Sequence, residues 1–225
     1  MTERYVRPDP AHNAKVGGNQ TFGQYRVSVT TGILAATLAA GANVFNFYYK
    51  APALAAGNRA ALQAVISRIR ARFLPMTPFT AGTADVGSFD AFVFRGAGGA
   101  PTTQLVTLTT NNGKLQTNMA TTNAVMSISA TAALATTGLP TTPTYDANAF
   151  ASAERGYFGN VAAGTAELPS PTDLDLTFYP NIQQFESPLI LGNNEGFSIL
   201  NRTIWPAAGT GALNVEISWS EVSAY

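Results

Sequence analysis

Hydrophobic and polar residues alternate strictly near the end of the chain. From residue 213 to residue 220 every second side chain is large and apolar, and the side chains between them are polar or acidic. A period of two is typical of a β-strand with one buried and one solvated face. The stretch 195–202 (EGFSILNR) shows a shorter version of the pattern. The alternation predicts these core residues: Phe197, Ile199, Leu213, Val215, Ile217 and Trp219.

Similar short patterns recur along the chain, without the alternation of strands and helices that a parallel sheet requires. They predict strands at residues 22–29, 43–49, 88–95, 103–109, 124–130, 174–179 and 189–191. We expect the first two of these strands to pair with each other. The series favours an all-β fold, a single antiparallel β-sandwich of jelly-roll type over residues 22–225. Residues 1–21 hold few large apolar side chains and are expected to form an extended N-terminal arm.

Residues 62–73 fit two periods at once. Their apolar side chains lie at helical spacing, whereas Arg68, Arg70 and Arg72 share one parity, as they would on a strand. We favour a short turn or helical start around residues 57–62, followed by a strand that ends at Phe73, because two prolines follow closely and strands are predicted on both sides. An amphipathic helix is the alternative. On a strand the three arginines lie on one face, about 7 Å apart, and form the candidate interface.

Composition narrows the range of partners. The chain has 225 residues, with 13 basic and 13 acidic side chains, so its net charge is zero. A neutral chain lacks the overall attraction to nucleic acid or to an anionic membrane, and neither partner is expected. Weak repulsion between copies permits close packing of identical chains. The absence of cysteine excludes disulfides and thiolate sites.

The titratable residues do not form a pattern typical of catalysis or metal binding. His12 is the only histidine, which excludes a triad or a multi-histidine site within one chain. Asp173 and Asp175, with Glu167 nearby, are expected on a solvated strand face rather than at a calcium or glycosidase site. The arginine cluster lacks neighbouring lysines and stacking aromatics. We therefore expect no catalytic, metal or cofactor site.

Two further stretches are open to more than one interpretation. The glycine-rich residues 96–99 lack the Gly-Lys-Ser/Thr of a phosphate loop and are expected to form a flexible hairpin end. The aromatic run 47–49 and the pair Trp205–Pro206 are expected to pack in the core or an interface. A sugar-stacking platform is the alternative for these aromatics.

Several strings in a fixed order carry a resemblance to a known family. They are 79–82 (FTAG), 89–95 (FDAFVFR), 111–120 (NNGKLQTNMA), 195–202 (EGFSILNR) and 219–222 (WSEV). Over roughly residues 40–222 the chain resembles a family of virion-associated proteins of tailed bacteriophages and prophages. The resemblance implies a structural protein of the particle, with capsid decoration, or cementing, as its role.

The resemblance and the composition together predict a non-enzymatic virion component that is synthesised in the host cytoplasm. Its expected partners are the major capsid protein and copies of itself. We expect a trimer, because exposed sheet edges and low surface charge need covering. The alternatives are a tail- or fibre-associated adaptor, a jelly-roll coat protein and a host-glycan-binding module. No cofactor is expected.

Overall fold

The computed structural model of the chain consists of strands and their connections, with no helix in the residues that it describes. Those residues are 21–51, 63–80, 85–108, 113–115, 121–130, 143–153, 156–158, 175–180, 187–206 and 208–222. The prediction of an all-β fold is confirmed. The predicted arm at 1–21 lies almost entirely outside the described residues, and the expected turn or helical start at 57–62 lies wholly outside them.

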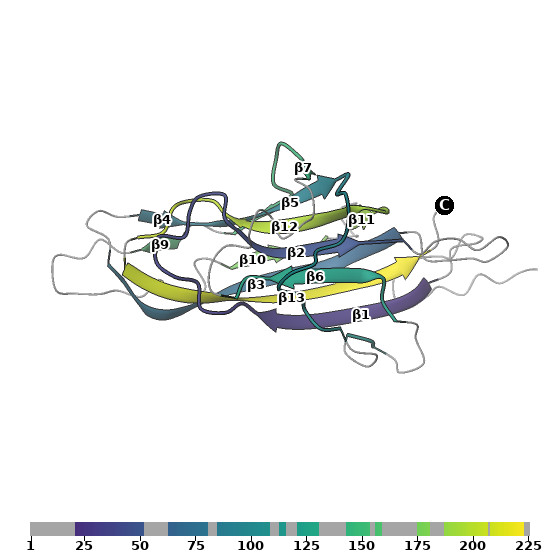
Figure 1. Cartoon of the computed structure of the whole chain (residues 1–225), viewed down its shortest axis with the longest axis horizontal. Helices are drawn as coiled ribbons and strands as arrows, with labels where there is room; N and C mark the ends of the chain where they lie inside the picture. Colours follow the sequence, from purple (N-terminus) through teal and green to yellow (C-terminus); the bar gives the residue numbers. More distant parts are fainter. Residues whose placement is uncertain are drawn as a thin grey trace, which may run out of the picture.

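The first sheet contains five strands, and all of its pairs are antiparallel. Its strands are β1 (Thr21–Thr30), β13 (Ala208–Val222), β3 (Gln63–Thr80), β10 (Leu176–Phe178) and β11 (Leu189–Leu191). The order is β1, β13, β3, and both β10 and β11 pair with the remaining edge of β3. The long strands β3 and β13 run along the longest dimension of the molecule (Figure 1).

The second sheet contains six strands and is also antiparallel. Its strands are β6 (Ala124–Ile128), β2 (Asn43–Tyr49), β12 (Glu195–Asn201), β5 (Phe89–Arg95), β7 (Thr144–Tyr145) and β8 (Ala151–Ser152). The order is β6, β2, β12, β5, with β7 and β8 both on the far edge of β5. A separate two-stranded sheet joins β4 (Asp85–Gly87) to β9 (Gly156–Phe158).

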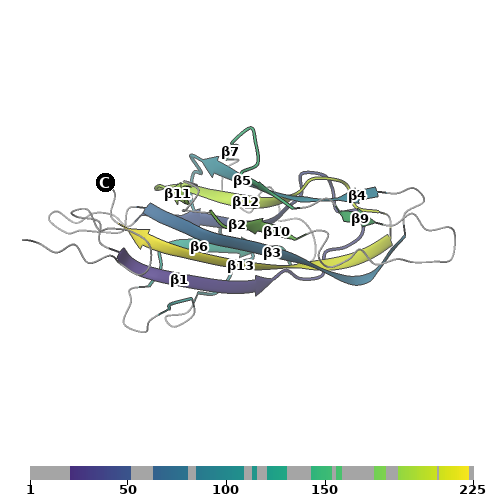
Figure 2. The same ribbon diagram turned by 180° about the vertical axis from the view of Figure 1, so that it is seen from behind.

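The two large sheets enclose one hydrophobic core, as in a β-sandwich. Figure 2 shows β3, β13 and β1 in front of β2 and β6. Aromatic rings fill much of the space between the sheets. Trp219 of β13 stacks on Tyr25 of β1 at 5.3 Å between ring centroids and meets the edge of Phe47 of β2 at 5.4 Å. The six side chains that the alternation assigned to the core are each at most 1% exposed.

The structure of β3 explains why its sequence fits two periods. Ala64 and Ile66 are fully buried, and so are residues of the opposite parity further along, such as Ile69. Between these two groups Trp219 pairs with Ile66 and Ser218 pairs with Arg68, which leaves Ser67 as an additional residue. A β-bulge of this kind changes the parity that faces the core, and the combined spacing imitates a helix. The strand interpretation is confirmed and the helical alternative is wrong.

The expected end of this strand at Phe73 is also wrong, because β3 continues to Thr80. Pro75 pairs with Gly211, but the next paired residues are Thr77 and Thr210, so the ladder is irregular beside the proline. A proline has no N–H to donate and is tolerated where the regular ladder is interrupted. The irregular register therefore lets the strand pass through the prolines.

Two other expectations about strands are corrected. The strands at 22–29 and 43–49 do not pair with each other, since β1 pairs with β13 whereas β2 pairs with β12 and β6. The connection between β1 and β2 passes from one sheet to the other, so neighbours in sequence belong to different layers. Residues 103–108 do not form a strand and contribute one isolated bridge, from Leu105 to Ser127.

Candidate interaction surface

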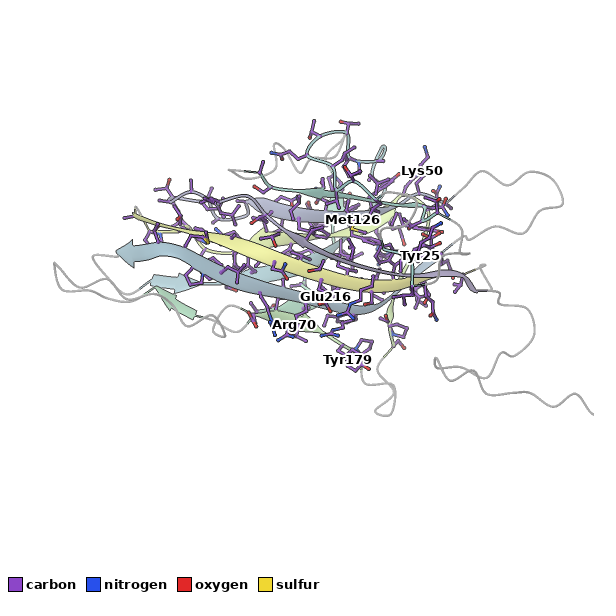
Figure 3. All side chains as sticks on the ribbon, turned by 90° about the horizontal axis from the view of Figure 1, so that it is seen from below. Tyr25, Lys50, Arg70, Met126, Tyr179 and Glu216 are labelled. Atoms are coloured by element: carbon purple, nitrogen blue, oxygen red, sulfur yellow. The ribbon has the colours of Figure 1, made fainter. Side chains whose placement is uncertain are left out.

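The solvent side of the first sheet carries a regular grid of side chains, which we call the basic face. In register across β1, β13, β3 and β10, three rows are formed by Arg26, Ser218 and Arg68, by Ser28, Glu216, Arg70 and Thr177, and by Thr30, Asn214 and Arg72. Tyr179 and Asp175 flank β10 at the level of the two outer rows. By the register of β10 with β3, Tyr179 extends the row of Arg68 and Asp175 extends the row of Arg72. Arg70, Glu216 and Tyr179 lie on the same side of the sandwich in Figure 3.

Glu216 is shared by several arginines. Its Oε1 accepts a hydrogen bond from Arg26 Nη2 at 2.7 Å and lies 3.5 Å from Arg68 Nη1. Arg70 is its direct partner in the register of β13 and β3. A single carboxylate thus contacts two guanidinium groups and faces a third arginine across the strand register, so positive charge is in excess at the centre of the face.

A second carboxylate lies at the edge of the grid. Asp175 Oδ2 is 3.9 Å from Arg72 Nε. Burial raises the pKa of Asp175, while the backbone of Phe73 and the charges of Arg72 and Arg70 act in the opposite direction. Four guanidinium groups and two carboxylates give the basic face a charge of two positive units when all six groups are ionised (4 − 2). Because the whole chain is neutral, other regions carry the compensating charge.

The solvent side of the second sheet is covered by the protein's own chain. The connection that leaves β5 runs across β12 and β2 towards β6 (Figure 1). Beneath it Tyr48 and Phe94 are fully buried and pack with Ala97 of the connection. Asn46 is also fully buried and bonds to Ser198 and to other polar side chains. The expectation of a flexible hairpin end at 96–99 is therefore corrected, because this segment helps to cover the sheet.

The same connection also borders the outer edges of both sheets. At β6, Val106 N donates to Met126 O at 2.9 Å, and Ile128 N donates to the carbonyl of Gln104. At β1, Arg26 N donates to Gly113 O at 2.6 Å, and Leu115 N donates to Gln24 O at 3.1 Å. Exposed edges were one reason to expect a trimer. Since the chain itself pairs with parts of these two edges, that reason no longer applies to those parts.

The aromatic residues considered for sugar stacking are buried. The run 47–49 is fully buried and Trp205 is 2% exposed. Trp205 Nε1 donates to Asn201 Oδ1 at 3.0 Å, and its ring packs edge-on against Phe73 at 5.5 Å. These residues pack in the core and offer no platform to a sugar. The other titratable candidates, His12, Glu167 and Asp173, lie outside the described residues.

An inward-facing carboxylate, Glu221, is a feature that the sequence analysis missed. It is 1% exposed at the end of β13. Its Oε1 accepts bonds from Thr122 Oγ1 at 2.5 Å and Asn123 N at 2.8 Å, and its Oε2 accepts one from Asn123 Nδ2 at 2.7 Å. Burial, with a smaller effect of this carboxylate, raises the pKa of Tyr25 to about 12 and also raises that of Tyr49. The available signal was its parity, which continues that of the predicted core residues.

A hollow of about 450 Å³ borders the basic face at β10. It is lined by Phe150, Ala151, Thr177, Phe178, Tyr179, Pro180 and Ser187. Tyr179 is 66% exposed, which makes it the most exposed large hydrophobic side chain of the described region. The basic face therefore ends beside an exposed aromatic ring.

No group of three or more metal-ligating side chains occurs in the part of the chain that the structure describes. That part also contains no helix long and apolar enough to cross a membrane. In comparisons with known proteins, no protein-family model matches the chain and no curated protein matches it at a significant level.

Proposed function

We propose that this protein is a non-enzymatic structural component of a phage particle, a decoration protein that binds and stabilises the capsid as a homo-oligomer. The observation that carries the proposal is the difference between the two solvent sides of the sandwich. One side is covered by the connection after β5, whereas the other presents a regular grid with arginines and an exposed tyrosine. Arginine and tyrosine are enriched in protein interfaces.

The strand pairing supports a fold of jelly-roll type. One set of pairs is nested along the sequence: β1 with β13, β2 with β12, β3 with β10 and β11, and β5 with β7 and β8. The remaining pairs within the two large sheets, β3 with β13, β5 with β12 and β2 with β6, join the nested pairs side by side. A long antiparallel ribbon that folds over on itself produces this nesting, and jelly rolls of two sheets occur in viral capsid proteins as well as in lectins. The fold alone does not determine the function, which depends on the side chains that the surface presents.

The proposed mechanism is mechanical. The sandwich is a rigid plate, because both sheets contribute to one aromatic core. Copies bind through the basic face to equivalent positions of a symmetric shell, and an arm at 1–21 adds further contacts. Each contact is weak, but oligomerisation, with a trimer as the simplest case, multiplies their strength.

The number of copies in purified particles tests this proposal. Quantitative mass spectrometry against the major capsid protein is expected to find hundreds of copies. A few dozen or fewer would favour the tail- or fibre-associated adaptor, and absence from the particle would refute a virion role. Particles that shed the protein without losing their shell would distinguish decoration from a coat protein.

A further inference from the structure

One arginine on the basic face differs from all the others that the structure describes. Arg26, Arg68, Arg72, Arg95 and Arg202 each lie within 4 Å of a carboxylate. Arg70 is the exception among the arginines of the described residues, and it occupies the centre of the basic face, between Glu216 of β13 and Thr177 of β10. Among the described arginines, the one with the most central position is thus the one that has no carboxylate within 4 Å.

Glu216 makes its ion pairs with two arginines of the adjacent row and not with Arg70, its direct partner in the register. The hydrogen bond from Arg26 and the approach of Arg68 both engage Glu216 Oε1. The short side chains around the arginines, Ser28, Thr30, Thr177, Asn214 and Ser218, leave the guanidinium groups as the largest polar groups of the grid. Arg72 is exposed and Arg68 and Arg70 are partly exposed, so an approaching anion can reach all three.

We propose that the basic face binds an acidic strip on the surface of a protein partner, with Arg70 as the central contact and Tyr179 as an aromatic anchor. This inference rests on the proposed function, in which the partner is a component of the particle. Residues 68, 70 and 72 are spaced by about 7 Å, which equals the separation of every second side chain on an extended strand. An extended segment with a carboxylate at every second residue therefore matches Arg68, Arg70 and Arg72, which we call the arginine column. Each guanidinium can bind a carboxylate with two hydrogen bonds.

The composition of the face favours protein carboxylates over nucleic acid. Glu216 and Asp175 lie within the grid, where they repel a continuous phosphate backbone but suit a partner of mixed charge. Nucleic-acid surfaces combine positive grooves with several stacking aromatics. In the described part of the basic face, Tyr179 is the sole exposed aromatic side chain. The mixture of positive and negative side chains on the basic face also fixes the position at which a protein partner of complementary charge binds.

The test adds purified full-length protein back to particles that lack it and measures the dissociation constant. Arg70→Glu is compared with Lys50→Glu, which changes the net charge by the same two units at an exposed site beyond the end of β2. Lys50 and Arg70 lie on opposite sides of the sandwich (Figure 3). We expect Arg70→Glu to weaken binding at least about tenfold and Lys50→Glu to change it less than about twofold. Arg70→Gln, which adds no charge repulsion with Glu216, is expected to show an intermediate loss at an unchanged melting temperature.

The outcomes separate this inference from the proposed function. If wild-type protein does not bind the particles, the proposed function fails. If the wild-type protein binds, but Arg70→Glu and Arg70→Gln bind as tightly as the wild type, the inference is wrong although the proposed function stands. A peptide in which every second residue is glutamate is expected to compete with the particle for the wild-type protein and is not expected to bind Arg70→Glu. A duplex oligonucleotide that competes better than this peptide would show that the face binds nucleic acid instead.

Discussion

Replacing Glu221 tests how the end of β13 is held inside the sandwich. The carboxylate accepts three hydrogen bonds from Thr122 and Asn123, which directly precede β6 in the second sheet. It thus ties the first sheet to the second. Alanine at this position removes the acceptor and leaves a backbone N–H, a hydroxyl and an amide without their partner.

The expected magnitude follows from these contacts. A hydrogen bond to a charged group contributes about 1.5–3 kcal/mol, but Thr122 and Asn123 are partly exposed and can recover some bonding from water. We therefore expect Glu221→Ala to lower the free energy of unfolding by about 3–5 kcal/mol. Glutamine keeps one neutral acceptor, so Glu221→Gln is expected to cost about 1–3 kcal/mol.

A matched control lies on the opposite face of the same strand. Glu216 points outward, its side chain is 20% exposed, and its ion pairs are with the exposed or half-exposed side chains of Arg26 and Arg68. Glu216→Gln is expected to change the free energy of unfolding by less than about 1 kcal/mol. Urea unfolding followed by tryptophan fluorescence measures all three variants. Equal effects of Glu221→Ala and Glu216→Gln would refute the role given to the buried carboxylate.

Three further predictions concern the core, the tyrosines and the basic face. Trp219→Ala is expected to cost roughly 3–5 kcal/mol in urea unfolding, because the ring is buried between Tyr25 and Phe47; an unchanged midpoint would contradict the register of β13. Because the folded protein keeps Tyr25 neutral up to about pH 12, whereas an unfolded tyrosine ionises near pH 10, the contribution of Tyr25 to the free energy of unfolding should be constant below pH 10 and fall towards pH 12. Tyr25→Phe should make the alkaline fall of the free energy of unfolding smaller, with a remainder from the buried Tyr49; a pH profile identical to that of the wild type would argue against this contribution. Replacing Arg68, Arg70 and Arg72 together with alanine should change the free energy of unfolding by less than about 1 kcal/mol, measured in the same urea assay, and a large loss would show that the column is part of the fold.

The sequence predicts strands well where one face is buried and the other is solvated. The alternation in β13 locates its core residues because every second side chain contacts the opposite sheet. It fails to predict strand partners, because β1 and β2 pair with strands near the other end of the chain. Local patterns carry no information on such distant pairing.

Irregular elements account for most of the remaining errors. In β3, the bulge at Ser67 changes the inward parity, and no single period describes the strand. The connection after β5 has small residues such as Ala97, which resemble a loop in sequence but pack over Tyr48 and Phe94. The arginine column was visible from its parity, whereas its extension to Arg26, Glu216 and Tyr179 required the register between strands.

A reconstruction of the particle by electron cryomicroscopy shows which face of the sandwich meets the shell. We expect density for many copies on the capsid surface. We also expect the basic face, with Arg70 at its centre, to lie against acidic side chains of the capsid protein. A sandwich bound to the shell with β1, β13 and β3 turned towards solvent would contradict this expectation.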